Sequence, residues 1–173
     1  DVPEVAYVAA STPTAGGGRT PSLFLRKTQS NDGKDFELVK AALFDPIVDL
    51  VMDPADWRTV YALTPNDVYR LTIHDDGNPA TMDPDPTWTL LTGNLTTGTV
   101  AASELRTIEL VYDGAERVLV VGGHPGVFRL VHPQLADPAT PLFAPVWSEA
   151  GAVLPNSLVS DLRYDPIDKI LVA

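Results

Sequence analysis

The sequence contains no cysteine and only four lysines among its 173 residues. Without cysteine there is no disulfide framework, and the redox compartment is left open. The formal charge of −11 opposes binding to nucleic-acid phosphates or anionic lipids, because such surfaces require basic patches. We therefore expect no nucleic-acid partner. The acidic surface is compatible with solubility or with weak cation binding, and we favour solubility.

Long apolar runs are also absent, the longest lying near 118–121. A membrane-spanning helix needs about 20 apolar residues, so we expect no membrane insertion. The chain begins at Asp1 without a methionine or a signal peptide. We expect it to be a mature or excised piece of something longer.

Proline and glycine are plentiful and spread along the chain. The 16 prolines and 12 glycines separate apolar runs of a few residues, and 45% of all residues are hydrophobic. This pattern predicts a globular domain of short strands and frequent turns.

Two long stretches match position by position. "DLVMDPADWRTVYALTPNDVYRLT" at 49–72 aligns with "ELVYDGAERVLVVGGHPGVFRLV" at 109–131. A truncated copy, "DLRYDPIDKILVA", closes the chain at 161–173, and a degenerate copy opens it with "VAYVAAST" at 5–12 and "SLFLRKT" at 22–28. The chain thus begins and ends within a repeat unit.

The repeat spacing indicates the fold class. The aligned Leu50, Leu110 and Leu162 are 60 and 52 residues apart, close to the roughly 40 to 50 residues of a propeller blade with loop insertions. We predict an all-β protein of four-stranded antiparallel blades, with about three blades present as part of a larger β-propeller. The approximate units are 1–45, 46–98, 99–158 and a truncated 159–173.

Strand positions follow from alternation within a unit. We predict strands at 48–54, 59–64, 67–73 and 87–92, separated by Pro, Asn and Gly turns. Within 67–73, Val68, Arg70 and Thr72 are expected on one face and Tyr69, Leu71 and Ile73 on the other. The segment 100–110 has helical propensity, but the repeat places Leu110 in a strand. We interpret it as a loop leading into that strand.

A further signature follows the third strand of the units. "SNDGKDF" at 30–36 and the stretched "HDDGNPATMDPDPTW" at 74–88 resemble the Asp-box of sialidase-, sortilin- and xyloglucanase-type propellers. The third unit retains only Trp147. The resemblance implies a structural turn motif with an aromatic packed between blades. The matching residues are Ser30, Asp32, Gly33 and Phe36 in the first unit and Asp76, Gly77, Thr87 and Trp88 in the second.

The repeat alignment also predicts the structural roles of Trp88 and of three aligned aspartates. Trp88 should lie on the outer strand of its blade and be more buried than most aromatic residues. Asp53, Asp113 and Asp165 should occupy equivalent turns and accept local backbone hydrogen bonds.

Catalytic candidates are weak. The resemblance to xyloglucan-cleaving propellers implies a carboxylate in a loop, and Asp67 is the one candidate, although a turn residue capping a hairpin is the favoured interpretation. A sialidase would need three converging arginines. Arg70 and Arg129 instead occupy the same place in successive units, which favours repeated structural pairing.

Metal and modification sites are equally weak. Asp75, Asp76, Asp83 and Asp85 share one loop and could offer oxygen ligands to Ca²⁺, although a solvated acidic loop is favoured. His74, His124 and His132 lack metal-ligand spacing. The sequon at 94–96 matters only in a glycosylating secretory pathway.

The leading hypothesis is therefore a non-catalytic propeller segment of a large secreted or surface protein. It would bind protein or carbohydrate through its loops, or act as a rigid scaffold, with the remainder of the propeller or another chain completing the ring. The alternative is a propeller-type glycoside hydrolase acting on a polysaccharide.

Overall fold

The computed structural model describes residues 5–27, 36–40, 45–74, 86–97, 100–113, 116–151 and 156–173. Within this part of the chain all regular structure is β-strand, apart from one short 3-10 turn at Pro141–Phe143. The all-β prediction is confirmed. The described residues include no helix long and apolar enough to cross a membrane.

The strands form four sheets, which we number I to IV in chain order. Sheet I contains β1 (Val5–Pro13), β2 (Arg19–Lys27) and β3 (Glu37–Lys40). Sheet II contains β4 (Asp49–Met52), β5 (Thr59–Leu63), β6 (Val68–Thr72) and β7 (Thr87–Leu90). Sheet III contains β8 (Ser103–Asp113), β9 (Glu116–His124), β10 (Val127–Val131) and β11 (Trp147–Glu149), and sheet IV contains β12 (Arg163–Asp165) and β13 (Ile170–Val172).

Each sheet is an antiparallel meander, because every strand pairs with its neighbours in sequence. The four-stranded antiparallel sheets II and III match the predicted strand number. The four strands of sheet II lie within the predicted ranges, and β8 runs through Leu110 as expected. The segment with helical propensity thus enters a strand at Ser103, where pairing with β9 outweighs local preference.

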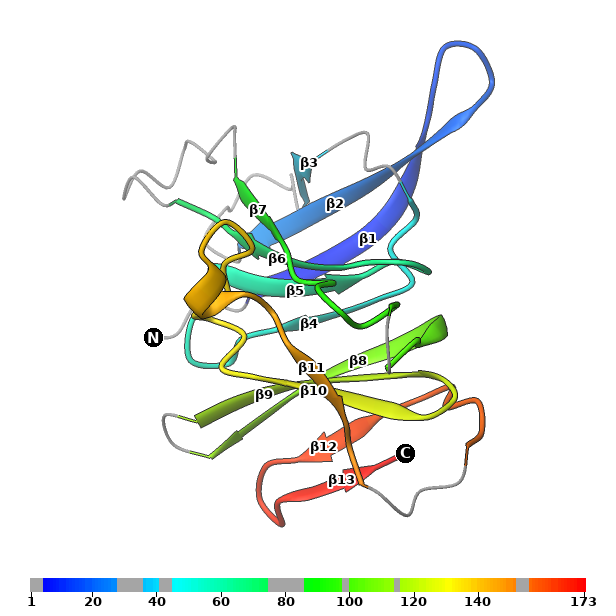
Figure 1. Ribbon diagram of the computed structural model, residues 1–173. Coiled ribbons are helices and arrows are strands. Elements are labelled where there is room, and N and C mark those ends of the chain that lie inside the picture. Colours follow the sequence, from blue (N-terminus) through cyan, green and yellow to red (C-terminus); the bar gives the residue numbers. More distant parts are fainter. Residues whose placement is uncertain are drawn as a thin grey trace.

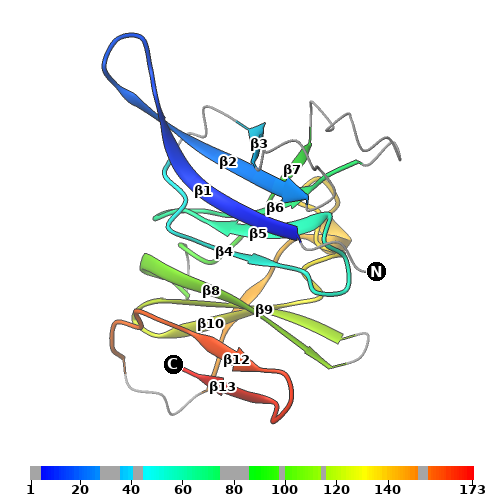
Figure 2. The same cartoon turned by 180° about the vertical axis from the view of Figure 1, so that it is seen from behind.

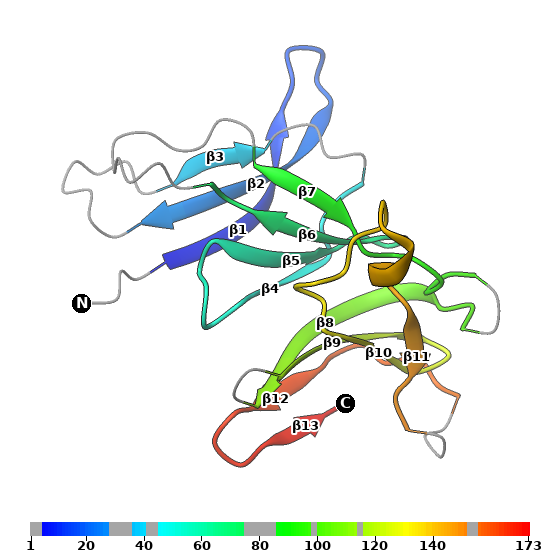
Figure 3. The ribbon, with the colours of Figure 1, turned by 60° about the vertical axis from the view of Figure 1, so that its left-hand side comes forward.

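The sheets follow one another through space in chain order. Figures 1 and 2 show, from opposite sides, sheet I beside sheet II, then sheet III, then sheet IV nearest the C-terminus. Figure 3 shows the same succession from another direction. The first strands lie together, since β4 contacts β8 and β8 contacts β12. Hydrogen-bonded strand pairing within the described residues joins no sheet to the next.

Three apolar clusters fill the spaces between successive sheets. One joins Leu23 and Leu25 of sheet I to Leu71 of sheet II. A larger one lies between sheets II and III, and a third places Leu162 against Val120 of sheet III. Sheets II and III therefore contribute both faces to the core, as expected for strands packed between two neighbours.

Strand β6 shows how the sequence pattern achieves this. Val68 points into the cluster between sheets II and III, whereas Leu71 and Ile73 point into the cluster between sheets I and II. The predicted alternation is confirmed for these residues. Alternation at period two sends successive side chains to opposite faces.

Candidate functional site

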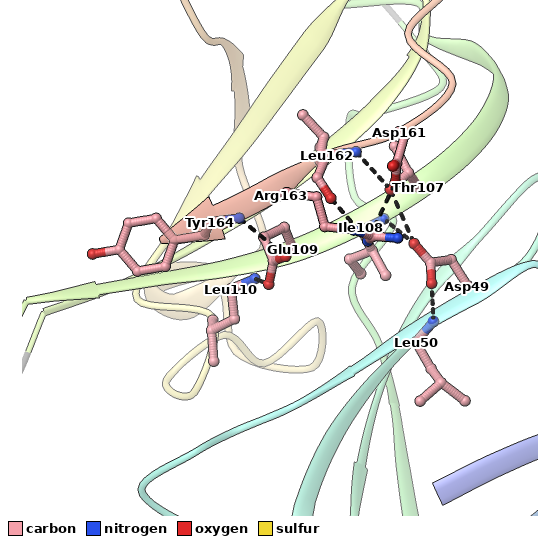
Figure 4. Close-up of polar contacts among 10 residues, drawn as sticks. All are labelled: Asp49, Leu50, Thr107, Ile108, Glu109, Leu110, Asp161, Leu162, Arg163 and Tyr164. Atoms are coloured by element: carbon pink, nitrogen blue, oxygen red, sulfur yellow. Dashed lines mark hydrogen bonds and ion pairs between the residues drawn. The ribbon is translucent and has the colours of Figure 1, made fainter. Parts of the chain in front are cut away.

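The most regular polar arrangement joins the first strands of successive sheets. In Figure 4, the Asp49 side chain at the start of β4 reaches toward β8. Its carboxylate accepts hydrogen bonds from the Ile108 backbone N–H at 2.9 Å and from the Thr107 hydroxyl at 3.0 Å. It also accepts its own neighbour's N–H, from Leu50, at 2.9 Å. One half-buried carboxylate therefore fixes sheet II to sheet III.

Glu109 on β8 occupies the same repeat position as Asp49. Like Asp49, it accepts the N–H of the residue that follows it and an N–H of the next sheet. Its carboxylate accepts the N–H of Leu110 at 3.0 Å and the N–H of Tyr164 on β12 at 3.4 Å (Figure 4). Thr107 extends the link, because its hydroxyl oxygen accepts the Leu162 N–H at 3.2 Å. Sheets III and IV are thus joined as sheets II and III are.

The third member is Asp161, which precedes β12. Its side chain is 60% exposed, and it lies 3.2 Å from the guanidinium of Arg163 in the same strand region. It contacts no further sheet in the described part of the chain. Sequence reasoning missed this series. A signal was present, because an acidic residue directly precedes each of the aligned Leu50, Leu110 and Leu162.

A buried ion pair joins sheets II and III at the opposite end of these strands. The Asp53 carboxylate lies 2.7 Å from Nε of Arg117 on β9, and its side chain is 4% exposed. The other oxygen of Asp53 accepts the Ala55 N–H at 2.9 Å. Asp165 closes the equivalent turn after β12 by accepting the Ile167 N–H at 2.8 Å. The predicted local role is confirmed for Asp53 and Asp165, and the Asp113 side chain is outside the described part.

Tyr61 lies near this ion pair, within the core between sheets II and III. Its hydroxyl is buried and has no hydrogen-bond partner among the described residues. Burial raises the pKa of Tyr61 well above its ordinary value, and the nearby Asp53 carboxylate raises it further. Such a phenol stays protonated and neutral at ordinary pH, so it provides no acid or base for chemistry near neutrality.

Arg70 and Arg129 occupy matching places in β6 and β10. Each faces a hydroxyl residue on the fourth strand of its sheet, Thr89 at 3.4 Å from Arg70 and Ser148 at 3.3 Å from Arg129. Arg70 also donates from Nη1 to two carbonyl oxygens in the loop after β10, those of Pro133 at 2.9 Å and Gln134 at 2.6 Å. Arg129 is exposed. These contacts support repeated structural pairing rather than a converging anion site.

Asp67 lies in the turn between β5 and β6, which the Thr64 hydroxyl caps by accepting the N–H groups of Asn66 and Asp67. Its carboxylate accepts the Thr92 hydroxyl at 2.8 Å, and its backbone pairs with Thr64. The pKa of the neighbouring Tyr69 is raised, first by burial and then by the Asp67 and Asp45 carboxylates. The Asp45 carboxylate in turn accepts a hydrogen bond from Nδ2 of Asn66 at 3.3 Å. Both carboxylates therefore stabilise loops at this end of sheet II. Asp67 lies in a turn as expected, but its carboxylate holds the segment after β7 and does not cap the hairpin.

Only part of the Asp-box prediction falls on described residues. Phe36 is 44% exposed, Thr87 begins β7, and Trp88 packs half-buried against the cluster between sheets I and II. Trp88 is therefore on the edge strand of its sheet, as predicted. The remaining Asp-box residues lie outside the described part: Ser30, Asp32, Gly33, Asp76 and Gly77.

The fully buried tryptophan is Trp147, at 2% exposed, and Phe128 and Tyr61 are also buried, at 2% and 0%. Trp88, predicted to be more buried than most aromatic residues, is half-buried and less buried than these three. Burial of Trp147 is favoured because its indole N–H donates to the Leu91 carbonyl at 2.7 Å, whereas the buried indole N–H of Trp88 has no partner in the part of the chain that the structure describes. A buried indole is stable where its polar atom is satisfied.

The metal and modification candidates gain no support from geometry. The calcium candidates Asp75, Asp76, Asp83 and Asp85 lie outside the described residues, and the described part contains no cluster of three metal-binding side chains. All three histidines are exposed: His74, His124 and His132. In the sequon, the Asn94 side chain is bound to the Trp147 backbone through both its amide nitrogen and its oxygen, at 3.1 and 2.7 Å. A glycan there would compete with these bonds.

One concave surface lies at the end of sheet III. A hollow of about 390 Å³ is lined by the β9–β10 turn at Gly126 and Val127 and by the segment 157–161. Serine hydroxyls and the Asp161 carboxylate offer polar groups there, beside the apolar Leu158 and Val159. Comparison with protein-family models, curated proteins and solved structures finds no match.

Proposed function

We propose that the chain is a non-catalytic segment of an Asp-box-like β-propeller, built from the four units at 1–45, 46–98, 99–158 and 159–173. Sheets II and III would be complete blades, and sheets I and IV parts of blades. Its role would be that of a scaffold in an extracellular or cell-surface protein, presenting loops to a carbohydrate or protein ligand.

One observation carries this proposal most directly. An acidic residue at the same repeat position links the first strand of one sheet to the first strand of the next, at Asp49 and again at Glu109. In a propeller the first strands lie innermost around the central axis. Repeated links between them favour a radial arrangement over a two-layer sandwich.

The polar groups of the described region favour a scaffold over an enzyme. Asp49, Asp53 and Glu109 hold successive sheets together, and Asp67 holds the segment after β7 through Thr92. Glycoside hydrolysis needs two carboxylates placed on either side of a scissile bond. The carboxylates of Asp67 and Asp45 are instead engaged by Thr92 and Asn66. The hollow at the end of sheet III is the surface we propose for ligand contact.

The functional test measures binding and turnover together. The purified chain is incubated with a panel of soluble β-glucans and xyloglucans, and retention in affinity gels is compared with release of reducing ends. We expect the chain either to be retained in the gels or to show no interaction with the polysaccharides. In neither case should it release more reducing ends than heat-denatured protein does. Release that is lost in Asp67→Asn would establish the hydrolase instead. A crystal structure with the sheets in a parallel two-layer sandwich would refute the propeller.

A further inference from the structure

The loop between β10 and β11, residues 132–146, gathers exposed apolar side chains on one short stretch. Leu142 is 85% exposed and Val146 is 68% exposed, and Phe143 beside Leu142 is also exposed. A chain covers at most about 3.6 Å per residue, so these three side chains leave the backbone within about 15 Å of one another. Single apolar residues on a surface are ordinary, whereas several gathered together mark a contact surface. We call these three residues the loop patch.

Both ends of this loop are fixed to sheet II. At its start, Arg70 of β6 donates to the carbonyls of Pro133 and Gln134 at 2.9 and 2.6 Å. At its end, Asn94 binds the backbone of Trp147 through both its amide nitrogen and its oxygen, at 3.1 and 2.7 Å. Figure 1 shows the loop, in yellow to orange, reaching back beside sheet II. The loop patch is therefore carried by a segment that is anchored at both ends.

Asp137 closes the middle of the loop on itself. Its backbone N–H donates to the Phe143 carbonyl at 2.7 Å. Its carboxylate accepts the Ala139 N–H at 2.9 Å and the Thr140 hydroxyl at 2.8 Å. Four prolines restrict the backbone further: Pro133, Pro138, Pro141 and Pro145. Because an ordered loop loses less conformational entropy on binding than a flexible one, the loop patch is preorganised for contact.

The charge and the size of this surface specify the kind of partner. The loop contains one acidic residue, Asp137, and no lysine or arginine, and the chain as a whole carries a formal charge of −11. A negative field attracts basic partners and repels both anionic lipids and a second copy of the chain. A stable interface between folded proteins uses about 20 to 30 residues on each side, which is more than one loop supplies. The partner that fits is a short basic segment with apolar side chains.

We propose that the loop patch binds a basic amphipathic peptide segment of another protein. The apolar face of that segment covers Leu142, Phe143 and Val146, and its lysines or arginines are attracted by the negative charge of the chain. This inference rests on the proposed function, in which the scaffold presents loops to a protein ligand. It adds a second contact surface to the hollow at the end of sheet III and names the chemistry of the ligand.

Three synthetic peptides separate apolar contact from charge. The first is a helix-forming peptide of about 15 residues with leucines along one face and lysines along the other. The second has glutamate in place of every lysine, and the third has the composition of the first in scrambled order. Each carries fluorescein, and binding to the full chain is measured by fluorescence anisotropy. We expect the first to bind at least about 10-fold more tightly than the others, because it alone combines an apolar face with positive charge.

Leu142→Ser and Ile167→Ser form a matched pair of variants. Ile167 lies between β12 and β13 and is 88% exposed, so both changes remove an aliphatic side chain of nearly equal exposure. Surface substitutions of this kind leave folding almost unaffected. Leu142→Ser should weaken binding of the first peptide by about 10-fold, and Ile167→Ser should leave it unchanged. In NMR spectra of the unchanged chain, the amide shifts caused by the peptide should centre on residues 142–146.

Four results overturn the proposal. Either control peptide can bind as tightly as the first, or Leu142→Ser can bind the first peptide as tightly as Ile167→Ser does. Without peptide, a molecular mass that rises with protein concentration in the unchanged chain but not in Leu142→Ser assigns the loop patch to a second copy. Binding to phosphatidylcholine vesicles that Leu142→Ser abolishes assigns it to a lipid surface. None of these results concerns turnover or the arrangement of the sheets, so failure here is separate from failure of the scaffold proposal, which the turnover and crystal tests decide.

Discussion

Asp53 and Arg117, 64 positions apart, form a 2.7 Å ion pair between sheets II and III, and the Asp53 side chain is almost completely buried. The same carboxylate closes the turn after β4 through the Ala55 N–H. One residue thus combines a local and a long-range role. The two roles can be separated by substitution, because an amide retains an oxygen for the turn but lacks the charge for Arg117.

Asp53→Asn should destabilise the chain by about 3 kcal/mol, since it leaves a partly buried guanidinium without its counter-charge. The measurement is the free energy of unfolding in urea. Asp165→Asn is the matched control, because Asp165 closes the equivalent turn but is exposed. It should cost less than about 0.5 kcal/mol. Equal losses in the two variants would show that the turn, and not the ion pair, carries the stability.

The two tryptophans on the fourth strands should differ in their contribution to stability. Trp147 is fully buried with its indole N–H bound to Leu91, so Trp147→Ala should cost about 3 to 5 kcal/mol. Trp88 is half-buried and its indole N–H has no partner within the described residues, so Trp88→Ala should cost about half as much. Urea denaturation of both variants tests the order. A larger loss at Trp88 would contradict this account of the two sites.

The strands were predictable because their signals are local. The alternation of Val68 and Leu71 gives both the strand and the face that each residue occupies, and turn residues mark where β5 and β6 end. The position of Asp67 in a turn was also accessible, since Asp is favoured in turns, whereas its hydrogen bond with Thr92 was not.

The contacts between sheets were not predictable in the same way. Asp49 meets Ile108 across 59 positions, and Arg70 meets the Pro133 carbonyl across 63. Nothing in the local pattern specifies which backbone groups a side chain will reach in a neighbouring sheet. The repeat alignment marks the acidic position before each aligned leucine, but only the packing of one sheet on the next gives that position a function.

A half-buried tyrosine, Tyr7, and a fully buried one, Tyr61, provide a test of hydrogen-bond satisfaction. The Tyr7 hydroxyl on β1 donates to the Trp57 carbonyl at 2.8 Å, whereas the Tyr61 hydroxyl has no partner in the described part of the chain. Tyr7→Phe should therefore cost about 1 kcal/mol, and Tyr61→Phe should be neutral or stabilising by up to about 1 kcal/mol. Thermal and urea unfolding of the two variants give the comparison. Destabilisation by Tyr61→Phe equal to that by Tyr7→Phe would mean that its hydroxyl has an acceptor after all.

The same tyrosines should make the fold sensitive to alkali. Burial is the first cause that raises the pKa of both Tyr7 and Tyr61 in the folded chain, and nearby aspartates raise it further. The folded state therefore holds phenol protons that the unfolded chain releases above about pH 10. The resulting stability is fully present below that pH and is lost progressively above it, as the pH rises toward the raised pKa values of the folded chain. We expect the urea midpoint to be constant between about pH 8 and 9 and to fall steeply by about pH 11.

The double variant Tyr7→Phe, Tyr61→Phe should lose less stability over this range than the unchanged chain. An identical decline in both proteins would assign the alkaline transition to other groups, and a midpoint that rises with pH would contradict the direction of both pKa shifts.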